Sequence, residues 1–149
     1  MILGEVEMYK HTQRGRLTVL FCVIAILLSA LFGIQHTVWI PLTLVIVLVL
    51  VIILFASLTI IVDDDYVRIK FGAGLIRKKF KLDDIKLCSI VRNKWWYGWG
   101  IHLTPRGWLF NVAGLDAVKL VMKNEKIYRI GTDEPQKLDA FIQSKLHNR

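Results

Sequence analysis

The chain contains one long region that is almost free of charge. Between Leu17 and Val62, His36 is the only side chain that can carry a charge near neutral pH. The whole chain has 149 residues, of which 54% are hydrophobic, and its mean hydropathy is +0.47. Such values are too apolar for a water-soluble domain of this length. The apolar excess is concentrated in this region, so we expect the region to enter a membrane.

The region divides into two apolar segments, residues 17–34 and 38–57, separated by the short link Gln35-His36-Thr37. A helix of the first segment would be roughly 27 Å long, which is about one hydrocarbon core. Because backbone amides in lipid need internal partners, both segments are expected to be helical despite many β-branched residues. The sequence therefore predicts a transmembrane helical hairpin over residues 17–57. A secretory signal is the alternative for the first segment.

The distribution of basic residues predicts the orientation of this hairpin. Lys10, Arg14 and Arg16 precede it, Arg68 and Lys70 follow it, and the link contains no basic residue. By the positive-inside rule, we expect a multi-pass protein of the inner cell membrane with both termini and the C-terminal domain in the cytoplasm. Residues 1–16 are expected to be a short cytoplasmic arm that is loosely ordered or lies on the membrane.

Residues 58–149 show short alternating runs separated by turn residues, which is typical of an antiparallel sheet. A helix is predicted over residues 133–147, because Leu138, Phe141, Ile142 and Leu146 form one apolar stripe and Asp133 can cap its start. The expected fold class is α+β, with an antiparallel barrel or sandwich closed by this helix. The predicted strands are Leu58–Val62, Tyr66–Phe71, Ile76–Leu82, Leu87–Val91, Gly100–Thr104, Trp108–Val112, Val118–Lys123 and Lys126–Ile130.

Several short motifs in this part resemble the bacterial PH-like (bPH) domain family, in its membrane-anchored form with two N-terminal transmembrane helices. The resemblance covers residues 58–146 and implies a PH-type barrel with a C-terminal helix, but no established chemistry or ligand. The motifs are Phe71-Gly72, Leu75-Ile76, Tyr97-Gly98-Trp99-Gly100-Ile101, Gly114, Ala117-Val118 and Ile130-Gly131-Thr132-Asp133-Glu134-Pro135.

The first predicted strand pair carries a row of basic residues. Alternation places Val67, Ile69 and Phe80 inside and leaves the basic side chains outside, with Lys78 departing from the pattern. This row is a candidate site for anionic lipid or an acidic partner, and its spacing resembles the basic signature of some phosphoinositide-binding PH domains. The alternative is a solvated strand face with positive-inside bias. The candidate residues are Arg68, Lys70, Arg77, Lys79 and Lys81.

A second candidate surface is the aromatic segment that contains Trp95, Trp96, Tyr97 and Trp99. Four rings in five positions cannot all fill one small core, so some are expected at a surface that contacts a protein or a membrane. Alternatively, two of the rings plug an open end of the barrel and the others form a corner. A small-molecule stacking site and a nucleic-acid groove are further alternatives, although a membrane tether argues against nucleic acid.

The sequence shows no recognisable catalytic or metal-binding motif. The histidines have no ligand-type spacing, Cys22 and Cys88 lie in different environments, and Gly72-x-Gly74 lacks the rest of a dinucleotide loop. We therefore expect no enzyme activity, no cofactor and no metal. The expected function is a membrane-anchored interaction module that binds anionic lipid, another membrane protein or a second copy of the chain. The alternatives are an accessory subunit of a membrane complex or transporter that acts through transmembrane helices, and a membrane-bound enzyme.

Overall fold

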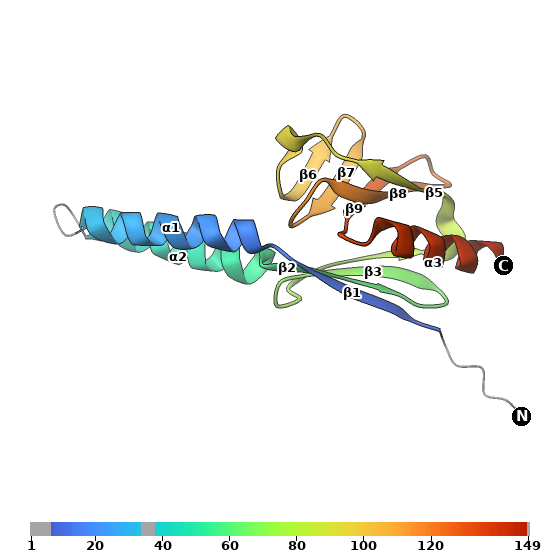
Figure 1. Ribbon diagram of the computed structural model, residues 1–149, viewed down its shortest axis with the longest axis horizontal. Helices are drawn as coiled ribbons and strands as arrows, with labels where there is room; N and C mark the ends of the chain where they lie inside the picture. The colour runs from blue at the N-terminus through green and yellow to red at the C-terminus, as the bar shows by residue number, and fades with distance from the viewer. Residues whose placement is uncertain (1–6, 34–37, 149) are drawn as a thin grey trace, which may run out of the picture.

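The computed structural model describes residues 7–33 and 38–148. A helical hairpin extends from one end of a domain that consists of two β-sheets and a C-terminal helix (Figure 1). The first six residues, Ile34 and the predicted link Gln35-His36-Thr37 lie outside the described residues.

The first sheet has the strand order β1-β2-β3-β4, and all of its neighbouring strands are antiparallel. The structure confirms the sequence-predicted bounds of β3(Tyr66–Phe71) and places β2(Ser57–Val62) and β4(Ile76–Lys81) within one residue of prediction. The strand β1(Tyr9–Arg14) was not predicted and lies in the segment assigned to a loose arm. Its inward side chains include His11 and Gln13, so it lacks the apolar alternation that reveals the other strands.

The second sheet has the order β5-β8-β9-β7-β6. Its strands β7 and β9 are parallel, so the expectation of an entirely antiparallel sheet is wrong. After β7 the chain runs through β8, which is antiparallel to β9 and lies on the side of β9 away from β7. The chain then returns as β9 in the same direction as β7. The strands are β5(Ile85–Arg92), β6(Gly100–Thr104), β7(Gly107–Asn111), β8(Asp116–Met122) and β9(Ile127–Gly131).

The hydrophobic core lies between the two sheets and beneath helix α3(Pro135–His147). Alternate residues of β2 and β3 face it, among them Leu58, Ile60 and Ile69, and each is fully buried. Strand β8 contributes Val118, Leu120 and Met122, as its alternation predicts. Removal of this apolar surface from water stabilises the fold by roughly 25 cal/mol per Å².

The helical hairpin consists of α1(Arg16–Gly33) and α2(Trp39–Phe55), which pack side by side (Figure 1). Strand β1 leads into α1, and α2 leads into β2. The helices carry many exposed large apolar side chains, such as Phe21 at 61% and Ile46 at 61% exposure, and α2 has no buried residue.

The expectation of a transmembrane hairpin is wrong. In the parts of the chain that the structure describes, none of the helices has both the length and the apolar character needed to cross a bilayer. Helix α2 has 17 residues because the chain turns into β2 at Ser57, and this length corresponds to only about 25 Å. Helix α1 begins at the charged Arg16. This finding overturns the predicted multi-pass topology in the inner membrane with a cytoplasmic C-terminal domain.

Backbone contacts fix the base of this hairpin to the first sheet. Gly15 N–H donates to the Ala56 carbonyl at 2.8 Å, directly beside the pairing of β1 with β2. In the turn between β3 and β4, Ala73 N–H donates to the Ile53 carbonyl of α2 at 3.2 Å. Gly72 allows this approach, because it has φ +47° and a Cβ there would lie 1.9 Å from the Ile53 carbonyl oxygen.

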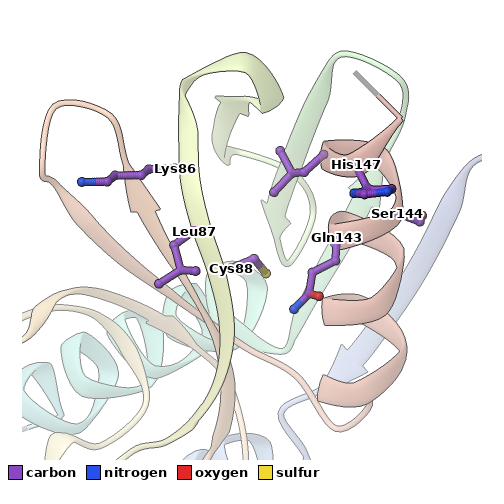
Figure 2. A pocket seen from close by; sticks show the side chains of 7 residues that line it. Lys86, Leu87, Cys88, Gln143, Ser144 and His147 are labelled. Carbon is purple, nitrogen blue, oxygen red and sulfur yellow. The ribbon is translucent and has the colours of Figure 1, made fainter.

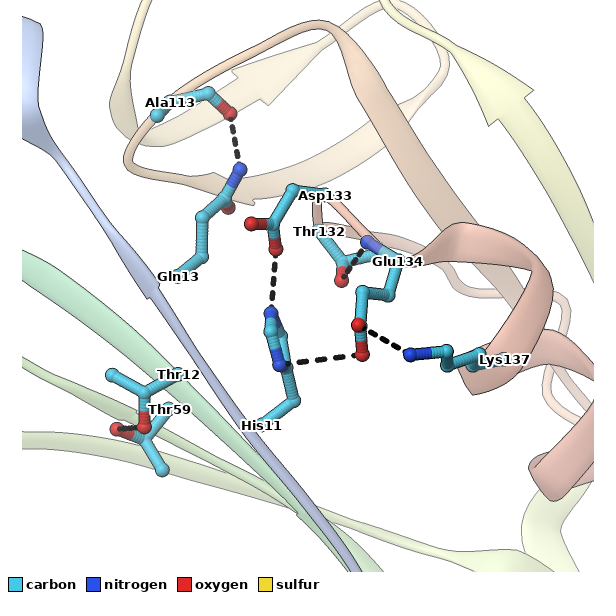
Figure 3. Close-up of polar contacts among 9 residues, drawn as sticks. All are labelled: His11, Thr12, Gln13, Thr59, Ala113, Thr132, Asp133, Glu134 and Lys137. Carbon is cyan, nitrogen blue, oxygen red and sulfur yellow. Dashed lines mark hydrogen bonds and ion pairs between the residues drawn. The ribbon is translucent and has the colours of Figure 1, made fainter.

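Strand β1 also joins the first sheet to the start of α3 (Figure 3). His11 Nε2 lies 2.5 Å from Asp133 Oδ1, and Gln13 Nε2 donates to the Ala113 carbonyl at 3.0 Å. The predicted capping role of Asp133 is wrong: the residue before the helix is Glu134, which makes no side-chain cap bond. Asp133 lies against β1 instead, a contact that local sequence cannot reveal.

Candidate functional site

The first sheet brings the five sequence-predicted basic residues onto its outer face. Arg68 lies directly opposite Lys79, and Lys70 lies directly opposite Arg77, in the pairing of β3 with β4. Lys81 lies opposite Tyr66 on the same face. The alternate residues Val67, Ile69 and Phe80 are buried on the inner face, as predicted.

Strand β1 extends this outer face by two further basic residues. Lys10 lies opposite Ile61, Thr12 opposite Thr59, and Arg14 opposite Ser57, and all are on the side away from the core. The Thr12 and Thr59 hydroxyls lie 2.9 Å apart. Sequence reasoning missed Lys10 and Arg14 as part of this site, because they were assigned to the arm before the first helix. We call the outer face of β1 to β4 the basic sheet face.

The electrostatics of the basic sheet face are unfavourable to the isolated fold. Like charges that lie directly opposite on neighbouring strands destabilise a sheet, and two such pairs adjoin here. The sequences of the four strands contain no Asp or Glu. Asp63, in the turn before β3, pairs with Arg68 at 2.7 Å, and Asp83, in the 3-10 helix η1(Leu82–Asp84) after β4, pairs with Lys81 at 3.4 Å. The centre of the face therefore has an excess of positive charge.

The aromatic segment forms a different surface. It contains the short 3-10 helix η2(Trp95–Tyr97) in the connection between β5 and β6. Trp95 and Trp96 are 76% and 59% exposed, and Lys94 Nζ lies 4.7 Å from the Trp96 ring centroid. Trp99 lies near the hairpin, with its ring centroid 6.5 Å from that of Phe21. The exposed rings do not fill the core, in agreement with the expectation that some of them lie at a surface.

A buried arginine lies next to the start of the aromatic segment. Arg129 on β9 is only 5% exposed, and its Nη1 donates to Asn93 Oδ1 at 3.0 Å. Burial lowers the pKa of Arg129, and the neighbouring charge of Arg106 lowers it further. Within the described residues, Arg129 Nε and Asn93 Nδ2 have no hydrogen-bond partner. Sequence reasoning missed this pair, since neither residue belongs to a recognisable motif.

The basic sheet face and the aromatic segment do not form one site. The first belongs to β1 to β4, whereas the second connects strands of the other sheet, on the opposite side of the molecule (Figure 1). The fold therefore presents them as two separate surfaces.

A groove between β5 and α3 contains the one buried thiol of the β domain (Figure 2). Cys88 Sγ donates to Asp139 Oδ1 at 3.0 Å. Burial raises the pKa of the Cys88 thiol, and Asp139 raises it further because it accepts the hydrogen bond and repels the thiolate. The thiol is therefore protonated at neutral pH and is a poor nucleophile.

The described residues contain no group of three or more His, Cys, Asp or Glu side chains that could hold a metal ion. His102 instead has its Nε2 atom 2.5 Å from the Trp99 carbonyl. No protein-family model and no curated protein matches the chain. The resemblance to PH-like domains and the absence of enzyme activity therefore stay predictions.

Proposed function

We propose that the chain is a non-enzymatic binding module whose basic sheet face binds anionic lipid headgroups. The observation that carries the proposal is the two directly opposed like-charge pairs, Arg68 with Lys79 and Lys70 with Arg77. The fold bears the cost of this repulsion without an acidic residue in any of the four strands. A bound layer of anions relieves the repulsion, and each Lys or Arg near an anionic lipid surface gains about 1 kcal/mol.

The character of the face favours lipid headgroups over an acidic protein. Protein interfaces depend on a few large side chains, usually aromatic, that enter pockets of the partner. On the basic sheet face Tyr66 is the one aromatic side chain, and Arg68 and Lys79 lie over its ring at 5.6 and 5.2 Å. Tyr66 is therefore covered by cations. A flat array of flexible cations without such an anchor suits a fluid array of headgroups.

Charge reversal tests the proposal without weakening the fold. In the double variant Lys70→Glu/Lys79→Glu, each new carboxylate lies opposite an arginine, so two repulsive pairs become attractive. We expect stability to be unchanged or to rise by about 0.2 to 1 kcal/mol per pair. Binding of the full chain to vesicles of mixed phosphatidylglycerol and phosphatidylcholine should weaken at least about tenfold at low salt. Co-sedimentation and thermal denaturation measure the two effects.

The matched control is Lys86→Glu/Lys123→Glu, which changes the net charge equally at exposed lysines away from this face. It should retain binding. Binding to vesicles of phosphatidylcholine alone measures how much the apolar hairpin contributes to vesicle binding. This amount is subtracted from the binding to the mixed vesicles. Equal loss in both double variants would mean that only net charge matters and would overturn the proposal. So would a face variant that keeps its phosphatidylglycerol binding but loses binding to polyglutamate, since that result identifies an acidic protein partner.

A further inference from the structure

A groove separates the two sheets at the edge strand β4 of the first sheet and the edge strand β6 of the second. Its volume is about 370 Å³, which lies within the range of small-molecule sites. Residues of β4 form one wall, and residues of β6, β7 and β9 form the other. The groove is distinct from the Cys88 groove of Figure 2, which lies between β5 and α3.

The floor of this groove is a preformed cluster of aromatic rings. The Phe110 ring centroid lies 6.3 Å from those of both Phe71 and Tyr128, and Phe71 and Phe110 are 1% and 7% exposed. Trp108 is the register partner of Tyr128 and lines the groove while it remains 43% exposed. Burial fixes the inner rings, so an apolar ligand meets little ordering cost.

The rim of the groove is cationic. Arg77, Lys78 and Lys126 line it, and its lining residues include no Asp or Glu. Lys78 lies opposite Ile69, which places it in the inward register of β4 and off the basic sheet face. Its Nζ atom lies 5.9 Å from the Tyr128 ring centroid. Lys78 thus gives the groove a positive charge that does not belong to the basic sheet face, whereas Arg77 belongs to that face as well.

We propose that this groove binds a single-chain anionic amphiphile. The anionic head, a carboxylate or a phosphate, lies between Lys78 and Lys126, and the apolar chain covers Ile76, Ile101 and the aromatic floor. The charge of the rim selects an anion, whereas the floor selects a molecule with an apolar body. Neither lysine belongs to the basic sheet face, so this proposal can be tested independently of the proposed binding of lipid headgroups.

Calorimetric titration of the full chain with monomeric dodecanoate tests the charge requirement. Dodecyl phosphate provides the alternative anionic headgroup, and dodecyl maltoside provides an uncharged one. Lys78→Ala/Lys126→Ala should weaken binding of the preferred anion about tenfold. Lys86→Ala/Lys123→Ala should leave it unchanged. A tighter complex with dodecanoate identifies a carboxylate ligand, and one with dodecyl phosphate identifies a phosphate ligand.

Ile101→Trp fills the groove and keeps all three cations, so it tests the apolar requirement separately. It should abolish binding while thermal denaturation remains cooperative. A diazirine on the far end of the dodecanoate chain should crosslink to the peptides that contain Ile101, Trp108 or Tyr128. Crosslinks confined to α1 and α2 would overturn the proposal, because the amphiphile would then coat the exposed helices. Equal affinity for dodecyl maltoside, or affinity unchanged by both lysine substitutions, would also overturn it.

Discussion

At the scale of single residues, Tyr9 shows how β1 is coupled to the start of α3. Its ring packs on Phe141 with the centroids 5.7 Å apart. Burial, together with repulsion of the phenolate by Glu134 and Asp133, raises the pKa of Tyr9 from 10.0 to about 12. The folded state therefore disfavours ionisation of this hydroxyl more than the unfolded state does.

This shift predicts an alkaline loss of stability. The folded pKa lies above the unfolded value, so the contribution of Tyr9 is complete below pH 10 and is lost as the pH rises toward 12. In Tyr9→Phe no phenolate can form, and the free energy of unfolding should fall less steeply over this pH window. Chemical denaturation of both proteins at several pH values measures the difference. Parallel curves throughout the window would show that Tyr9 ionises equally in both states.

At the scale of elements, the turn between β3 and β4 determines how the helical hairpin is attached. Gly72 N–H donates to the Ser57 carbonyl at 2.8 Å, and the next amide donates to the Ile53 carbonyl of α2. The last turn of a helix has carbonyls without intrahelical partners. The turn supplies a donor to one of them, so α2 ends against the sheet in a defined orientation.

Substitution of Gly72 should loosen this junction. In Gly72→Ala, the residue would have φ +47° and its Cβ would overlap the Ile53 and Leu54 carbonyls, at a cost of about 3 kcal/mol. Gly74→Ala is the matched control, since it has φ +85° but its Cβ would come no closer than 3.5 Å to Arg77. It should cost about 1 kcal/mol. Equal losses in urea denaturation would mean that φ alone, and not the approach of α2, requires Gly72.

Among these elements, some strands can be predicted from the sequence and others cannot. Strands β2, β3 and β8 follow from alternation, because one face of each is more deeply buried than the other, and β4 follows it except at the exposed Lys78. The part of the basic sheet face that lies on β3 and β4 follows from the same periodicity. In contrast, β1 has polar residues on its inner side, and their partners at Ala113 and Asp133 are 100 and 122 positions away. The pairing of β7 with β9 and the buried contact of Arg129 with Asn93 likewise depend on tertiary packing.

At the scale of the whole molecule, the helical hairpin is an insertion between two paired strands. Arg14 and Ser57 are register partners, and Gly15 and Ala56 are hydrogen bonded just beyond them. A direct link from Gly15 to Ala56 would therefore join β1 to β2 through a two-residue loop. Gly at the first position of such a loop suits a type II′ turn. The β domain needs only this short connection to close its first sheet.

Deletion of residues 16–55 should accordingly leave a folded β domain. The deletion removes most of the exposed apolar side chains, which on a free surface of this size favour association. We expect the shortened chain to be monomeric by light scattering where the full chain associates, and to retain the strand signature by circular dichroism. An unfolded product would show that Phe55, which packs on Phe71 with ring centroids 5.7 Å apart, is indispensable to the core.

The adjacency of Gly15 and Ala56 also bears on how quickly the first sheet can form. In the natural chain, β1 can find β2 only after the intervening segment of roughly 40 residues has brought its two ends together, and the entropy of that closure grows with its length. The shortened chain would replace this search with a local hairpin and lower its contact order. Its refolding rate in stopped-flow measurements should then exceed that of the natural chain. The inserted helices would thus slow the formation of the first sheet.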